Sequence, residues 1–99
     1  MTIAVPKTVT SIIEGHAVLP AGLRIPVHYP GTGAIISELC EADSWEVDRA
    51  VAAARHAFDQ GPWPRWSVER RQEVLLQIHD AILDHADELA QLECLNTGL

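Results

Sequence analysis

Residues 43–98 decide the fold, and they read DSWEVDRAVAAARHAFDQGPWPRWSVERRQEVLLQIHDAILDHADELAQLECLNTG. Apolar residues recur every three or four positions on both sides of the Gly-Pro-Trp-Pro break at 61–64, which is the periodicity of an amphipathic helix. The stretch therefore predicts an antiparallel helical hairpin, with two helices joined by a tight corner.

The first helix is expected over residues 43–60. Asp43 or Ser44 can cap its free N–H groups, and Glu46 follows three positions after Asp43, as in a capping box. Gly61 and the prolines after it end the helix. The spacing predicts a single apolar face, formed by Val47, Ala50, Val51, Ala54, Ala57 and Phe58.

A second, longer helix is expected over residues 67–97, with Ser67 as its N-cap. This length exceeds that of a typical globular helix, so we expect a break near residues 85–87, where Asp84 or Asp87 could cap a new start. The predicted apolar stripe consists of Leu75, Ile78, Ile82, Ala86, Leu89 and Leu92.

The residues before the helices indicate β structure. Residues 1–11 carry no clear pattern and are interpreted as a tail, whereas residues 12–41 are expected to form β-hairpins. The first hairpin is signalled by Ile12-Ile13 followed by the turn residues Glu14-Gly15.

A second hairpin is predicted from the alternation of apolar and polar residues over 23–29. Pro26 lacks a backbone donor and is therefore expected in an edge strand. Residues 30–33, Pro-Gly-Thr-Gly, form the turn, and residues 34–40 return as a strand. The Gly-Thr-Gly at 31–33 is not a dinucleotide-binding loop, because such a loop must open a helix.

Length and composition bound the function. A chain of 99 residues is at most one domain. The net charge of −7 argues against a nucleic-acid-binding surface. No apolar run is long enough to cross a membrane, and the two cysteines lie outside C-x-x-C spacing, which favours reduced thiols. We therefore expect a cytoplasmic protein without a membrane or nucleic-acid partner.

No residue pattern in the chain predicts catalysis by itself. The five histidines lack the spacing of a zinc-binding helix. Neither Cys40 nor Cys94 has the basic neighbourhood or helix N-terminus that activates a nucleophilic thiol. We therefore predict no catalytic and no cofactor-binding residue among these 99.

Taken together, five segments resemble the N-terminal part of the aldehyde dehydrogenase superfamily. Each motif is weak alone, but their order and spacing are specific, and they cover nearly the whole chain from Ile12. The segments are Ile12–Gly15, Val27–Gly33, Val47–Phe58, Trp63–Leu75 and Ala86–Gly98.

The resemblance implies an enzyme that oxidises an aldehyde to a carboxylic acid with NAD or NADP, through a cysteine nucleophile and a glutamate base that lie outside this segment. The chain would be a single partial domain, α+β alone and part of an α/β cofactor-binding domain in the whole enzyme. We expect it to be inactive alone, to pack on the remainder of the fold, and to form a homo-oligomer at full length. The Tyr-Pro-x-Thr-Gly at 29–33 is similar to that of some bacterial betaine aldehyde dehydrogenases.

One site of the family would involve this segment. Many members hold a structural monovalent cation with backbone carbonyls and an aspartate, and these positions correspond to Val27, His28 and Asn96. Asn96 replaces the aspartate and is a neutral, weaker oxygen donor for a hard cation.

Two other interpretations remain open at this point. One is a stand-alone helical-hairpin module that binds a partner through its alanine-rich and leucine-rich faces, and the other is a structural relic without enzymatic activity.

Overall fold

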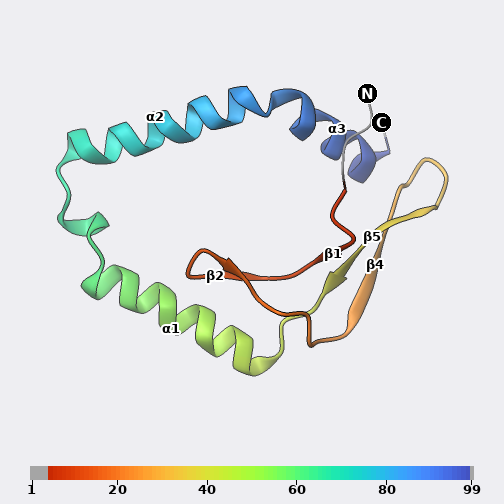
Figure 1. Cartoon of the computed structure of the whole chain (residues 1–99), viewed down its shortest axis with the longest axis horizontal. Coiled ribbons are helices and arrows are strands. Elements are labelled where there is room, and N and C mark those ends of the chain that lie inside the picture. Colours follow the sequence, from red (N-terminus) through yellow and green to blue (C-terminus); the bar gives the residue numbers. More distant parts are fainter. Residues whose placement is uncertain (1–4, 99) are drawn as a thin grey trace.

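The computed structural model describes residues 5–98 and confirms the α+β class (Figure 1). Short strands come first and helices follow. The elements are β1 (Thr8–Val9), β2 (Ile12–Ile13), β3 (His16–Ala17), β4 (Arg24–His28), β5 (Ile35–Cys40), α1 (Ser44–Gln60), the short 3₁₀ helix η1 (Trp63–Arg65), α2 (Val68–Asp84) and α3 (Ala86–Thr97).

The first predicted hairpin is confirmed as the antiparallel pair β2–β3, in which Ile12 lies opposite Ala17. Its two turn residues, Glu14 and Gly15, have φ angles of 54° and 79°. Positive φ at both central positions is the geometry of the tight turns that match the twist of a hairpin. The Glu-Gly pair therefore sets where the chain reverses.

The second hairpin is confirmed as β4–β5, which belongs to a three-stranded sheet in the order β1-β5-β4. Pro26 lies in β4 at the edge of this sheet, as predicted, so its missing N–H group weakens no inner ladder. The pairing register shifts between Val27 and His28, which marks a β-bulge.

The prediction of a tail over residues 1–11 is wrong for its second half. Thr8 and Val9 form β1, which pairs in parallel with β5. A strand of two residues is too short to show period-two alternation, and its partner lies 30 positions away, so no local pattern could indicate it.

Side-chain hydrogen bonds reinforce the placement of this N-terminal segment. Thr8 Oγ1 donates to Glu38 Oε1 at 3.0 Å, and Ser37 Oγ donates to the carbonyl of Pro6. Ser11 Oγ donates to Glu46 Oε2 at 2.9 Å, which ties the segment to the first turn of α1. Residues 6–11 are thus attached to both the sheet and the first helix.

Helix α1 begins as the sequence indicates, because Asp43 Oδ1 accepts the backbone N–H of Glu46 at 2.7 Å. The predicted face of α1 borders two neighbouring hollows, and Ala54 lines both. Ala50, Ala53 and Ala57 face Ile12 and Ile13 of β2 across a shallow hollow. The larger side chains of the same face stay largely exposed; these are Val47, Val51 and Phe58.

The corner after α1 is built from aromatic and basic side chains. The rings of Trp63 and Trp66 lie 5.8 Å apart, and the Arg70 guanidinium lies 4.9 Å from the Trp66 ring centre. Ser67 Oγ accepts the N–H of Arg70 at 3.1 Å and so caps α2, as predicted. The corner therefore fixes the point at which the chain turns back.

The second helical stretch breaks at His85, within the predicted range. The expected cap is wrong, because neither Asp84 nor Asp87 caps α3, and its first residue follows His85 without a side-chain cap. The His85 N–H remains bonded to the carbonyls of Ala81 and Ile82, at 3.1 and 3.2 Å, so the break is a bend between two contiguous helices.

The molecule is open and flat. α1 and α2 run in opposite directions along two sides of the outline in Figure 1, and within residues 5–98 they do not pack along each other. The radius of gyration is 17.1 Å, whereas a compact chain of this length has about 13 Å. The smallest dimension is 17 Å, which leaves no room for a second layer to cover the helices.

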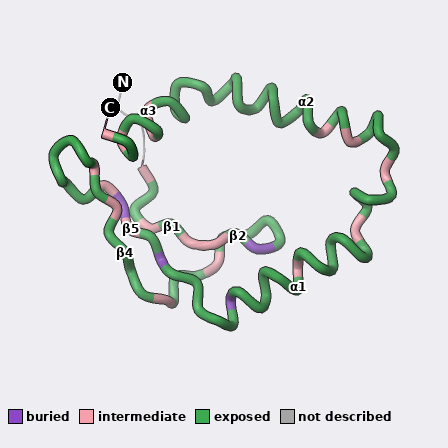
Figure 2. The backbone as a smooth tube through the Cα atoms, turned by 180° about the vertical axis from the view of Figure 1, so that it is seen from behind, coloured by how far each residue is buried: buried purple, intermediate pink, exposed green. Residues whose placement is uncertain are grey.

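Burial follows from this shape (Figure 2). Among the described residues the buried positions are few and lie in β2, β5 and the start of α1; they are Ile13, Ser37, Cys40 and Glu46. No side chain of α2 is buried, although that helix carries five large apolar residues of the Leu and Ile type. The apolar surface predicted for a core is therefore largely exposed.

Candidate functional site

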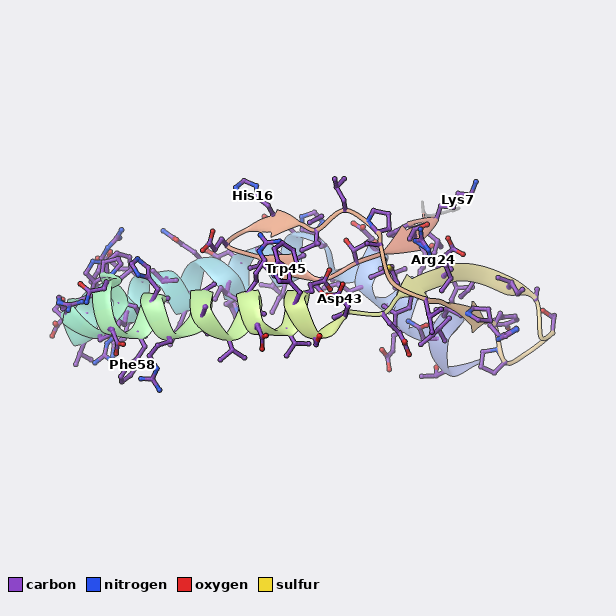
Figure 3. All side chains as sticks on the ribbon, turned by 90° about the horizontal axis from the view of Figure 1, so that it is seen from below. Lys7, His16, Arg24, Asp43, Trp45 and Phe58 are labelled. Atoms are coloured by element: carbon purple, nitrogen blue, oxygen red, sulfur yellow. The ribbon has the colours of Figure 1, made fainter. Side chains whose placement is uncertain are left out.

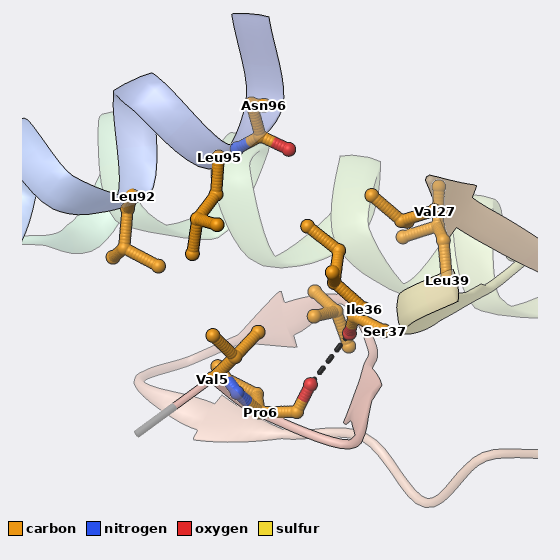
Figure 4. Close-up of a pocket in the computed structure, with 10 residues that line it drawn as sticks. Val5, Pro6, Val27, Ile36, Ser37, Leu39, Leu92, Leu95 and Asn96 are labelled. Atoms are coloured by element: carbon orange, nitrogen blue, oxygen red, sulfur yellow. Dashed lines mark hydrogen bonds between the residues drawn. The ribbon is translucent and has the colours of Figure 1, made fainter. Parts of the chain in front are cut away.

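A groove of about 310 Å³ lies between the N-terminal segment, the sheet and α3 (Figure 4). Two of the three predicted cation-site residues line it, Val27 from β4 and Asn96 from the last turn of α3. His28, the third, is not among the lining residues. The full lining is Val5, Pro6, Val9, Val27, Ile36, Ser37, Leu39, Leu92, Leu95 and Asn96.

The strand side of the groove is irregular where backbone oxygens were predicted to serve. Val27 pairs with Ser37, but His28 pairs with Ile35, so Ile36 is the extra residue of the bulge. A bulge disrupts the ladder locally and leaves backbone groups outside the regular pairing. The extra residue, Ile36, therefore lies in β5, opposite the Val27–His28 step of β4.

Gly98 allows the end of α3 to lie close to the turn that follows β4. Gly98 caps α3 with φ 81°, and its N–H donates to the Cys94 carbonyl at 2.9 Å. A Cβ atom at Gly98 would lie 2.9 Å from Cβ of Pro30, in the turn that follows β4. This close approach explains how Val27 and Asn96, 69 positions apart, reach the same groove.

The groove offers few polar side chains. Ser37 is already bonded to Pro6, which leaves the Asn96 amide as the other polar side chain of the lining. No charged side chain belongs to that lining. Neutral carbonyl and amide oxygens can coordinate a hard cation. The lining of this groove supplies no negatively charged oxygen, which strengthens most such sites. Within residues 5–98 no three His, Cys, Asp or Glu side chains gather as a metal-binding group.

The cysteines have unremarkable settings. Cys40 is buried at the end of β5, where its sulfur accepts the N–H of Gly22 at 3.3 Å. Cys94 is exposed near the end of α3.

Sequence reasoning missed the apolar part of the groove. Val5, Pro6 and Val9 come from the segment interpreted as a tail, and they meet Leu92 and Leu95 only through the fold. The signal present in the sequence was the apolar character of Val5 and Val9. A strand of two residues is too short for these residues to form a recognisable pattern.

The sequence comparisons agree with this arrangement. Residues 18–99 match the model of the aldehyde dehydrogenase family. The chain therefore belongs to the aldehyde dehydrogenase family, and it corresponds to an N-terminal portion of those proteins. It spans about 16% of the length of the two curated plant relatives described next.

Two plant proteins illustrate the similarity. Aldehyde dehydrogenase family 2 member B4, mitochondrial, of Arabidopsis thaliana is 43% identical over 88% of this chain. Benzaldehyde dehydrogenase, mitochondrial, of Antirrhinum majus is 41% identical over the same share.

A solved structure shows the same arrangement of elements. The NAD-dependent aldehyde dehydrogenase from Sinorhizobium meliloti matches 92% of this chain with a TM-score of 0.83 and 38% identity, and the match covers 18% of that protein.

Among the described residues, no helix combines the length and apolar character that crossing a membrane requires.

Proposed function

We propose that this chain is the N-terminal part of an NAD(P)-dependent aldehyde dehydrogenase that oxidises an aldehyde to a carboxylic acid. In this proposal its residues supply scaffold, and the reacting groups belong to the rest of the enzyme. The observation that carries the proposal is the likeness, at TM-score 0.83, to an NAD-dependent aldehyde dehydrogenase of which the chain covers only 18%.

The exposed helix faces support the scaffold role. Leu75, Ile78 and Ile82 of α2 are all more than half exposed, although their spacing is that of a core-facing stripe. Contiguous apolar surface of this kind marks an interface. We infer that the remainder of the aldehyde dehydrogenase fold covers this stripe.

The proposal concerns a class of reaction, the oxidation of an aldehyde group. One relative is named for benzaldehyde and another for 2-hydroxymuconic semialdehyde, so the shared feature is the aldehyde group. A betaine-aldehyde-like substrate, assembly into a homo-oligomer and a cytoplasmic location belong to the same proposal and rest on the family resemblance.

The test compares the chain with the complete reading frame that contains it. The 99-residue chain should form no NADH or NADPH from an aldehyde, and NAD should leave its melting temperature unchanged, because a ligand that does not bind cannot stabilise. The complete protein should form NADH or NADPH from an aldehyde. A saturable NAD-dependent shift of the isolated chain would contradict the scaffold role. A native gene that stops at Leu99 would favour the stand-alone module or the relic.

We also propose that Val27, His28 and Asn96 hold a monovalent cation in the whole enzyme. The support is the bulge at Val27–His28 and the groove that Val27 shares with Asn96. Two backbone carbonyls and an amide oxygen would be the donors, and the role would be structural.

A further inference from the structure

The groove between the N-terminal segment, the sheet and α3 carries no charge of its own. Its lining is apolar apart from Ser37 and Asn96, and no Asp, Glu, Lys or Arg side chain belongs to it. Asn96 stands at the position where the family resemblance places an aspartate, and it is the single asparagine of the chain. The oxygens that this chain offers to a cation in the groove are therefore all neutral.

The Asn96 amide is free to act as a ligand. Within residues 5–98 its side chain takes part in no hydrogen bond, whereas the next side chain is engaged, since Thr97 Oγ1 donates to the Glu93 carbonyl at 2.8 Å. In Figure 4 the amide oxygen of Asn96 is turned toward the side of the groove on which Val27 lies. The view from below in Figure 3 shows that the strands and α3 lie at the same end of the flat molecule.

Neutral oxygens discriminate between cations through the cost of removing water. Sodium is smaller than potassium and holds its hydration shell more tightly, so a site needs a stronger, charged ligand to replace that shell. Rings of neutral carbonyl oxygens are the ligands that potassium-selective channels use. Calcium sites gain their strength from charged carboxylates, and magnesium gives up its water reluctantly. A site of neutral oxygens therefore suits the most weakly hydrated of these four ions.

We propose that Asn96 makes the cation site of this protein selective for potassium over sodium and excludes calcium and magnesium. The inference rests on the proposed structural cation at Val27, His28 and Asn96, and it adds which ion that site takes. The chemical cause is the uncharged amide at a position where a carboxylate would strengthen the binding of the smaller and the divalent ions most.

Thermal melting of the complete enzyme tests the proposal, with choline chloride as the reference salt at equal ionic strength. Potassium chloride should raise the melting temperature of the wild type, because an ion that binds only the folded protein stabilises it. The potassium concentration that gives half of this rise should be several-fold below that of sodium. Calcium and magnesium chloride should give the same melting temperature as choline chloride.

Asn96→Asp is the decisive variant, and Gln91→Glu is its matched control. Both replace an amide by a carboxylate on α3, but Gln91 does not belong to the groove lining. Asn96→Asp should bring the half-saturating concentrations of sodium and potassium together and should let calcium raise the melting temperature. Gln91→Glu should keep the potassium preference of the wild type.

The outcomes separate this inference from the proposal on which it rests. Equal half-saturating concentrations of sodium and potassium in the wild type, or an unchanged preference in Asn96→Asp, would overturn the selectivity and leave the cation site standing. Melting temperatures that match choline chloride in every salt, for the wild type and for Asn96→Asp, would remove the cation site and the selectivity together. Loss of the preference in Gln91→Glu as well would show that overall charge, and not Asn96, sets it.

Discussion

Replacing Ser11 by alanine should destabilise the chain by about 2 kcal/mol. Ser11 Oγ donates to Glu46 Oε2 at 2.9 Å, and Glu46 is only 9% exposed. A hydrogen bond to a charged group contributes roughly 1.5–3 kcal/mol, and its removal leaves a carboxylate oxygen without its donor in a buried place. A loss of about 2 kcal/mol lowers the folding equilibrium constant about thirtyfold, since each 1.4 kcal/mol is tenfold.

An exposed bond of the same length provides the control. Arg70 Nη1 and Glu73 Oε2 are also 2.9 Å apart, but their side chains are 49% and 61% exposed. Glu73→Gln should therefore cost less than about 0.5 kcal/mol. Urea titrations followed by far-ultraviolet circular dichroism would compare both variants, with Ser11→Thr as a variant that keeps the hydroxyl. If Ser11→Ala cost no more than Glu73→Gln, the burial argument would be refuted.

Two further predictions concern the groove. Gly98→Ala should lower the free energy of unfolding more than Gly33→Ala does. Both positions have positive φ, which costs about 1 kcal/mol for alanine, but a Cβ at Gly98 would also lie 2.9 Å from Pro30, whereas a Cβ at Gly33 meets nothing within 4 Å. Equal losses of stability in urea titrations would show that the contact with Pro30 is not formed. In the complete enzyme, Asn96→Asp should enlarge the rise in melting temperature that sodium or potassium chloride produces over choline chloride, since a carboxylate is a stronger donor; identical melting of both proteins in all three salts would contradict the proposed cation site.

Much of the fold could be predicted because its signals are local. Asp43 and Ser67 cap helices within three residues of themselves, and a proline restricts its own strand whatever the rest of the chain does. The Glu14-Gly15 turn is equally self-contained. The fold class and the family resemblance follow from such features.

The prediction of a tail was wrong at Thr8 and Val9 because β1 depends on a distant partner. β1 exists only because β5 is beside it, and the part of the α1 face that is covered depends on where β2 lies. Of the candidate site, the sequence indicated Val27 and Asn96. The apolar lining from Val5 and Val9 was not predictable, because it depends on where the first residues return to the sheet.

The bonds of the N-terminal segment have a consequence for synthesis. Pro6, Thr8 and Ser11 find their partners at Ser37, Glu38 and Glu46, so this segment cannot be fixed during synthesis until residues 30 to 35 positions further along the chain have emerged. The β2–β3 hairpin, by contrast, pairs residues that are separated by at most four others. It can therefore form before any later residue has been synthesised. Strand β1 must therefore stay unpaired until β5 has been synthesised, and the Ser11–Glu46 bond can form only after α1 has begun.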